Sequence, residues 1–202
     1  LIKAIAGVIP DKRDASCVRH TLTTLLIQRI SQIACGYEDG TDCDTLRNDP
    51  IFRMLAGRYP EIGDALASRP TMSRFENSVS RTTSYRIAVV LADVFVASYE
   101  TPPPVIVPDS DDTEDKVHGN QQQSLFNGYH GNHCFMPLHV YEGLSGRLIT
   151  TVLKPGKRSD GQQMLSIVRR VVDYLHEKWA ETLILFRGDG HFSYPEVIDY
   201  IE

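Results

Sequence analysis

Three consecutive prolines, Pro102 to Pro104, interrupt the chain near its middle and constrain its fold more than any other feature. Proline lacks an amide hydrogen and clashes with the preceding turn, so a helix cannot continue through such a run. Before the prolines, apolar residues recur at helical spacing; after them, short apolar runs alternate with turn residues. We therefore expect an all-helical region over residues 1–100, followed by a mixed region of strands and helices over 101–202.

Two long helices are expected in the first region. Apolar residues recur at three- and four-residue steps across 15–36, and Gly36 supplies a stop. Ser73 and Glu76 have the spacing of a capping box, which predicts that a second helix begins there and runs toward Tyr99. The acid-rich stretch 38–49 between them is typical of a solvated turn that carries helix caps.

The second region predicts the order β-β-β-α-β-α. Strands are expected at 105–107, 134–141, 147–153 and 182–186, and helices at 161–179 and from Pro195 onward. The second and third strands should form an antiparallel hairpin across the turn at 142–146. In this layout the first and fourth strands can lie side by side.

Composition excludes several classes of protein. Of the 202 residues 42% are hydrophobic, yet no apolar run approaches the roughly 18 residues that cross a membrane. The four cysteines form no C-x-x-C pair, which argues against a zinc ribbon or a disulfide-stapled secreted fold. We expect a cytoplasmic protein with no membrane partner.

The charge is distributed unevenly. Its net value is −5, but residues 1–90 contain 12 Lys+Arg against 10 Asp+Glu, and the remainder contains 9 against 16. A mildly basic half is suited to phosphates, and an acidic half is suited to metal ions.

Asp111 and Asp189 each follow one of the expected apolar strands. If those strands are neighbours, the two carboxylates come together, and they repel one another unless a cation lies between them. Divalent ions held in this way are a common arrangement for phosphodiester cleavage. The alternative is that both residues are simply turn formers, and spacing alone leaves that choice open.

A series of blocks along the chain favours the metal site. In order they are GYEDGTDCDTLRNDPIFRMLAGR, LASRPTMSRFEN, DSDDTEDKVHGNQ, LFNGYHGNHCFMPLHVYEG, LKPG and LFRGDGHF. From about Arg13 to the last residue the chain resembles bacterial insertion-sequence transposases of the DDE type (group 1). The resemblance implies that the mixed region is part of a ribonuclease H-like domain, a sheet with flanking helices.

The resemblance also implies catalytic residues. The family's first acid lies in a D-x-D-x-T stretch, which makes Asp111 that residue and Asp109 the alternative, although Ser110 stands where relatives usually have an apolar residue. The second acid lies in an R-G-D-x-x-F block and corresponds to Asp189. The cofactor implied is Mg²⁺ or Mn²⁺, held by Asp111, Asp189 and Asp109.

The family's third acid is a glutamate on a later helix. Glu196 and Glu202 are the only glutamates after Asp189, and both come too early to match it well. We therefore expect the chain to be a fragment that by itself does not cleave DNA.

DNA contacts are implied at several other positions. His118 and Gln121 match the family's H-G-x-Q block and would contact phosphate or order the metal site, unless this is only a loop. Asn127 belongs to the LFNGY block, which is suited to packing or to DNA. Ser73 and Arg74 lie near a helix start that suits a phosphate or a base edge, unless they form a plain capping box.

A zinc cluster is the other candidate metal site. His130, His133, Cys134 and His139 are all of ligand type. However, Cys134 and His139 are expected on one strand at odd separation and would face opposite sides, so a structural role is favoured.

Together these observations predict a DNA transposase that uses metal ions to cleave strands at transposon ends and to transfer them to target DNA. Its partners would be double-stranded DNA, as terminal repeats and target. A second copy of the chain, in a homodimer, is a further candidate partner. Two alternatives stay open: a truncated, non-catalytic DNA-binding remnant, and a metal-dependent hydrolase of small phosphoesters.

Overall fold

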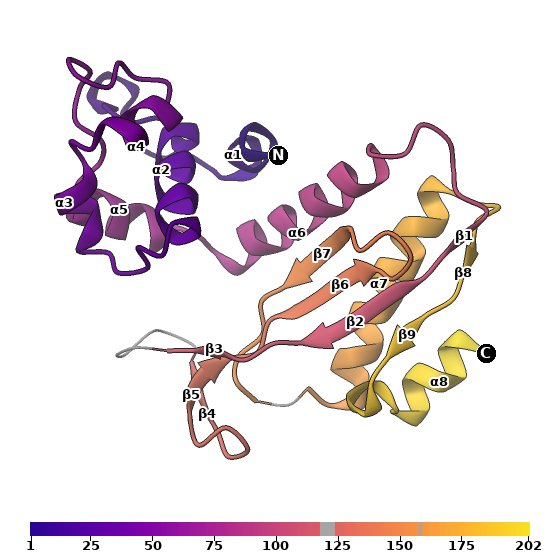
Figure 1. The fold of residues 1–202 in the computed structure, drawn as a ribbon. Helices are drawn as coiled ribbons and strands as arrows, with labels where there is room; N and C mark the ends of the chain where they lie inside the picture. Colours follow the sequence, from indigo (N-terminus) through magenta and orange to yellow (C-terminus); the bar gives the residue numbers. More distant parts are fainter. Residues whose placement is uncertain (118–123, 158) are drawn as a thin grey trace. The chain divides into compact units, whose positions relative to one another are not determined.

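A computed structural model describes residues 1–117, 124–157 and 159–202. The chain divides into two compact units, Leu1–Ile87 and Ala88–Glu202, which we call the helical unit and the sheet unit (Figure 1). The division falls inside a helix, earlier than the prolines, because the second half of that helix packs with the strands that follow: the Thr150 hydroxyl donates to the Ala88 carbonyl. No helix in the described ranges is long and apolar enough to cross a membrane.

Helices and turns make up residues 1–100, as expected. The helices are α1 (Ile2–Val8), a short 3₁₀ turn (Ala15–Cys17), α2 (Leu22–Ala34), α3 (Asp42–Leu46), α4 (Pro50–Leu55), α5 (Arg69–Glu76) and α6 (Arg81–Val96). The acid-rich stretch carries a helix cap, since the Asp49 carboxylate accepts from the amides of Ile51 and Phe52 at the start of α4.

The first long helix differs from its expected form in length and in orientation. It begins only after Thr21, whose hydroxyl accepts from the amide of Thr24. Its buried residues are Leu25, Gln28 and Gln32, whereas Ile33 is 46% exposed. The apolar pattern therefore predicted the wrong buried face, because two glutamines on this helix make hydrogen bonds inside the unit.

The prediction that a helix begins at Ser73 is wrong. Ser73 lies within α5, which Ser68 precedes as the N-cap residue and in which Pro70 occupies the first turn. Proline fits that turn because its missing amide hydrogen has no partner there anyway. A separate helix, α6, begins at Arg81.

Within the described ranges, the strands of the sheet unit form three small sheets. Their bounds are β1 (Val105–Ile106), β2 (Pro108–Asp112), β3 (Asp115–Lys116), β4 (Leu125–Asn127), β5 (Asn132–Phe135), β6 (Leu138–Glu142), β7 (Leu148–Val152), β8 (Leu183–Ile184) and β9 (Arg187–Gly188). The largest sheet has the order β7-β6-β2-β9, the second is β1-β8, and the third is β3-β5-β4. The fold is therefore a mixture of helices and small sheets.

The expected neighbours are confirmed. Strand β2 pairs with β6 and β6 with β7, both antiparallel, while β1–β8 and β2–β9 are parallel pairs. One strand is split, however. The run 134–141 forms β5 and β6 in different sheets, because Pro137, which has no amide hydrogen to donate, lies between them and accepts from the amide of Thr113.

The core of the sheet unit lies between the strands and two helices, α7 (Gly161–Lys178) and α8 (Pro195–Ile201). Figure 1 shows α7 behind the four-stranded sheet. The Asp160 carboxylate caps α7 by accepting from the amide of Gln163. The buried apolar residues of this core come from α6, the strands, α7 and the residue that follows it, the 3₁₀ turn Gly190–Phe192 and α8: Phe95, Ile106, Leu138, Val140, Ile149, Met164, Val168, Val172, Leu175, Trp179, Phe192 and Val197.

Candidate active site

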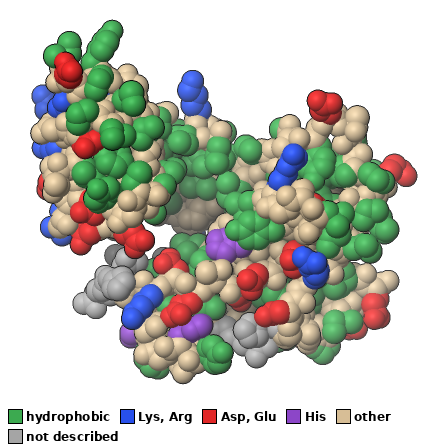
Figure 2. Space-filling model, viewed as in Figure 1, with side chains coloured by type: hydrophobic (Ala, Val, Ile, Leu, Met, Phe, Trp, Pro, Cys, Tyr) green, Lys and Arg blue, Asp and Glu red, His purple; other side chains and the backbone are tan. Residues whose placement is uncertain are grey.

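Three aspartates lie on β2, and the alternation of the strand gives them different surroundings. Pro108 and Ser110 are buried, whereas Asp111 is exposed on the other face. Figure 2 shows acidic side chains, with a basic one beside them, on the face where β2 and β9 run in Figure 1. The acid cluster thus lies inside a strand, whereas it was expected to follow one directly.

Asp112 points to the protein side of the strand and is neutralised there. The ammonium of Lys154 donates to its Oδ2 at 2.9 Å and lies 2.7 Å from its Oδ1. Both side chains are at most 10% exposed. This carboxylate is committed to an ion pair within the protein.

Asp109 is also paired, but at the surface. Arg187, its register partner on β9, donates to its Oδ2 at 2.5 Å. This hydrogen bond is the main cause that lowers the pKa of Asp109; slight burial opposes it, and the charge of Arg187 adds to it. Asp109 is therefore ionised at neutral pH, with one oxygen occupied.

Asp111 is the member of the cluster that stays open. Within the described ranges its carboxylate makes no hydrogen bond or ion pair with another side chain. Its register partner on β6 is His139, whose Nδ1 lies 3.0 Å from the Thr151 hydroxyl on β7.

Asp189 follows β9 directly. The parallel register pairs Asp109 with Arg187 and Ser110 with Gly188, so Asp111 and Asp189 stand at the next step of the same pair of strands. Gly188 is required here, because a Cβ at that position would lie 2.8 Å from the ring of Phe192. The carbonyl of Asp189 accepts from the amide of Phe192, which turns the chain away from the sheet.

This arrangement fits a divalent ion in its donor type. Carboxylate oxygens are the ligands that Mg²⁺ and Mn²⁺ prefer. Two exposed carboxylates at the ends of neighbouring parallel strands provide such donors, although no three His, Cys, Asp or Glu residues of the described ranges form a metal-binding group. The Glu196 carboxylate lies against Gly161 at the start of α7.

The residues of the candidate zinc cluster, for which a structural role was favoured, make separate contacts. His130 pairs with Glu114 at 3.1 Å, and Cys134 is buried in the three-stranded sheet. His139 belongs to the four-stranded sheet instead.

The residues expected to contact DNA have separate locations. Ser73 and Arg74 are exposed on α5, where Arg74 donates to the Thr71 hydroxyl at 3.3 Å. Asn127 uses its side chain within the protein: its amide donates to the Gly156 carbonyl at 2.7 Å, and its oxygen accepts from the amide of Tyr129. His118 and Gln121 lie outside the described residues.

Sequence reasoning missed the two cations beside the aspartates. Lys154 stands in the LKPG block and Arg187 in the RGD block, so both lay within recognised motifs. Their roles depend on strand register, which the motifs alone do not give. The same is true of His139, which β6 places opposite Asp111.

Comparison with known proteins gives the class of this chain. Residues 1–202 match the family model described as transposase DDE domain group 1. The chain therefore belongs to that family of transposase domains, whose members generally use divalent metal ions.

A second comparison concerns solved structures. The chain is similar to a piggyBac transposase in a synaptic complex with hairpin DNA, with a TM-score of 0.38 and 14% sequence identity. The alignment covers 98% of this chain and 50% of that one, so this chain spans about half the length of that transposase. No curated protein matches the sequence.

Proposed function

We propose that this chain is part of the catalytic machinery of a DNA transposase, in which Asp111 and Asp189 hold a divalent metal ion, Mg²⁺ or Mn²⁺, for strand cleavage and strand transfer at transposon ends. The observation that carries the proposal is the parallel pairing of β2 with β9, which brings these two acids to one step of the register. Membership of the DDE family supports the same assignment.

The neighbouring ion pairs give the two acids distinct roles. Lys154 neutralises Asp112, and Arg187 occupies an oxygen of Asp109. Asp111 therefore carries the free charge of β2, and Asp109 is the weaker candidate ligand. Lys154 and Arg187 thus compensate the charges of Asp112 and Asp109. The remaining repulsion is between Asp111 and Asp189, and a cation bound between these two carboxylates would relieve it.

A bound divalent ion would activate the attacking oxygen and stabilise the leaving oxygen of a phosphodiester. The chain itself contributes binding and orientation. The strand backbone fixes Asp111, and the glycine before Asp189 lets the chain turn closely over Phe192. Thr151 holds the ring of His139 beside Asp111.

We further propose that the sheet unit is part of a ribonuclease H-like domain. A ribonuclease H-like domain would require three antiparallel strands and a fourth strand that is reached through α7 and runs parallel to the first, and β2, β6, β7 and β9 have this arrangement. We also assign the helical unit and the sheet unit to DNA binding and catalysis respectively. Terminal repeats, target DNA and a homodimeric state are parts of this proposal, as are DNA contacts by Ser73, Arg74, Asn127, His118 and Gln121.

Strand cleavage tests the proposal. The full transposase, with Mg²⁺ and duplex DNA bearing the ends of its element, should nick those ends. Asp111→Asn and Asp189→Asn should each lower the rate on the order of a hundredfold or more, since misplacement of the reacting groups by about 1 Å has such an effect. Asp115→Asn, which changes an exposed acid of the three-stranded sheet, should retain the cleavage rate of the unsubstituted protein. Cleavage that survives Asp111→Asn would contradict the proposal.

A further inference from the structure

The helical unit contains a group of basic side chains that the catalytic proposal does not use. We call it the arginine cluster: Arg13, Arg19, Arg47 and Arg58, gathered around His20. Arg58 donates from Nη2 to the ring Nδ1 of His20 at 2.9 Å, and Arg13 donates from Nη1 to its carbonyl at 2.9 Å. Arg58 lies 38 residues from His20 along the chain, so the fold brings these groups together.

This crowding also affects the pKa of His20. Burial lowers its pKa first, and the charges of Arg58, Arg47, Arg19 and Arg13 lower it further. The ring is therefore neutral at pH 7 and can accept the hydrogen bond from Arg58. Arg13 and Arg58 contact His20 directly, and Arg19 and Arg47 act on its ring through their charge.

Carboxylates compensate this charge only in part. Asp11 pairs with Arg13 at 2.6 Å, and Asp14 is engaged with the amide and hydroxyl of Ser16. Arg19 is exposed and makes no hydrogen bond or ion pair within the described ranges. The Arg47 Nε is buried and lacks a hydrogen-bond partner in the same part of the chain. Uncompensated like charges at one place repel one another, and an anion would remove that repulsion.

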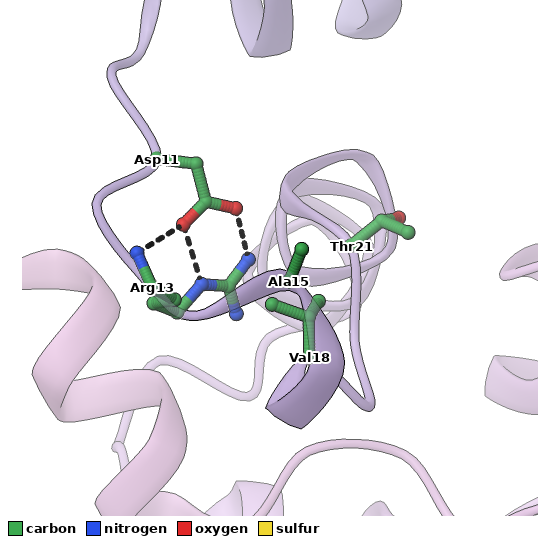
Figure 3. A pocket seen from close by; sticks show the side chains of 5 residues that line it. All are labelled: Asp11, Arg13, Ala15, Val18 and Thr21. Atoms are coloured by element: carbon green, nitrogen blue, oxygen red, sulfur yellow. Dashed lines mark hydrogen bonds and ion pairs between the residues drawn. The ribbon is translucent and has the colours of Figure 1, made fainter.

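The surface beside the cluster is hollow. A pocket is lined by Asp11, Arg13, Ala15, Val18 and Thr21. Figure 3 shows the paired Asp11 and Arg13 side chains together at this pocket. The arginine cluster therefore borders an open concave surface and is not sealed inside the unit.

We propose that the arginine cluster binds the phosphate groups of double-stranded DNA. The guanidinium of Arg19 makes no hydrogen bond within the described ranges, and its forked donors match phosphate oxygens. Arg13 and Arg58 contribute mainly charge, because they already donate to Asp11, to His20 and to the carbonyls of Asp64 and Ala65. All four arginines keep their charge at any relevant pH. Contacts of this kind position a duplex without reading its sequence. The identity of the partner as DNA rests on the proposed function, whereas the site itself is separate from the carboxylates of the sheet unit and from Ser73 and Arg74.

Two substitutions with opposite expected signs test the proposal. Binding of the full chain to duplex DNA is measured over a range of salt concentrations, with EDTA present so that no metal site contributes. Arg19→Ala should weaken binding to all sequences alike and reduce the salt slope by about 0.9, the value of one phosphate contact. Asp11→Asn should tighten binding several-fold, because it removes the carboxylate that competes for Arg13. A misfolded variant would not bind more tightly.

Two controls distinguish the arginine cluster from general surface charge and from a small-anion site. Arg86→Ala removes an exposed arginine outside the cluster and should leave the affinity nearly unchanged. Inorganic phosphate at matched ionic strength should not displace the duplex, since a single phosphate engages only part of the cluster.

Three results would overturn the proposal. Displacement of the duplex by inorganic phosphate would show a small-anion site. The chain could fail to bind duplex DNA at all, or Arg19→Ala and Asp11→Asn could both bind like the unsubstituted chain. Loss of cleavage in Asp111→Asn concerns the proposed catalysis and leaves these outcomes unaffected.

Discussion

The two units bury different kinds of polar side chain. In the helical unit, Gln28 is fully buried, donates to the Ala67 carbonyl and accepts from the Ala67 amide, both at 2.9 Å. In the sheet unit, the buried polar side chains include a charged pair, Lys154 with Asp112, and the carboxylate of Glu142, which accepts from backbone amides. In the helical unit, a neutral side-chain amide thus completes the hydrogen bonds of a buried backbone segment. In the sheet unit, a buried pair of opposite charges lies next to the candidate site.

The different buried polar groups accompany apolar cores of different size. The helical unit has a small buried apolar core of Leu25, Cys43, Ala67 and Met72, so a glutamine that completes backbone hydrogen bonds replaces part of the missing packing. The sheet unit has a larger apolar core that accommodates an ion pair. That pair removes the charge of Asp112 from the strand that presents Asp111, which leaves a single open carboxylate there.

Loss of Lys154 should have the largest effect on stability. Lys154→Met leaves the Asp112 carboxylate buried without its cation, and breaking such a pair costs about 3–5 kcal/mol of unfolding free energy. Urea unfolding of the full chain measures the loss, with Lys116→Met, an exposed lysine, as the matched control. A loss below about 1 kcal/mol would be the value of a surface pair and would contradict the description of this contact as buried.

Two glutamines on α2 provide a smaller, paired test. Gln28→Met leaves the Ala67 amide and carbonyl unsatisfied and should cost about 1–3 kcal/mol. Gln32→Met should be close to neutral, because the Gln32 Nε2 has no hydrogen-bond partner within the described ranges and its oxygen accepts only from the Cys43 thiol, at 3.2 Å. Both changes conserve volume, and both are measured by chemical unfolding. Equal losses for the two variants would refute the assignment of polar support to Gln28.

The surface pair of Asp109 with Arg187 should have the smallest effect, and it should depend on pH. Arg187 holds the pKa of Asp109 below that of an unfolded aspartate, which is about 3.9. Its contribution to stability is therefore fully present above that pH and is lost as the pH falls through the lower, folded pKa. The difference in unfolding free energy between the unsubstituted chain and Asp109→Asn should be small at pH 7 and smaller in strong acid. A difference that grows toward acid would contradict this sign.

Periodicity and motif order predicted much of the fold. Three features follow from sequence patterns: the change from helices to strands near the proline run, the hairpin of β6 with β7, and the pairing of the first with the fourth expected strand. The buried face of α2 did not, because apolar spacing takes no account of glutamines that satisfy a distant backbone. The break at Pro137 was also missed, since the apolar run 134–141 continues through it.

The candidate site was predictable only in part. Asp111 and Asp189 could be selected from their motifs and from their places after apolar runs. The sequence could not show that Asp109 and Asp112 are paired with cations while Asp111 is not. Those cations are far away along the chain: Lys154 is 42 residues from Asp112, and Arg187 is 78 residues from Asp109. Only the strand register connects them.

Calorimetric titration with Mn²⁺ tests the central claim most directly, namely that Asp111 and Asp189 act together on one ion. Asp111→Asn and Asp189→Asn should each weaken binding by at least about tenfold, since even indirect partners of metal ligands have effects of that size. The losses in the double variant should be less than additive, because both residues hold the same ion. Asp115→Asn should bind like the unsubstituted chain. Unchanged Mn²⁺ affinity in Asp189→Asn, or fully additive losses in the double variant, would contradict a shared site.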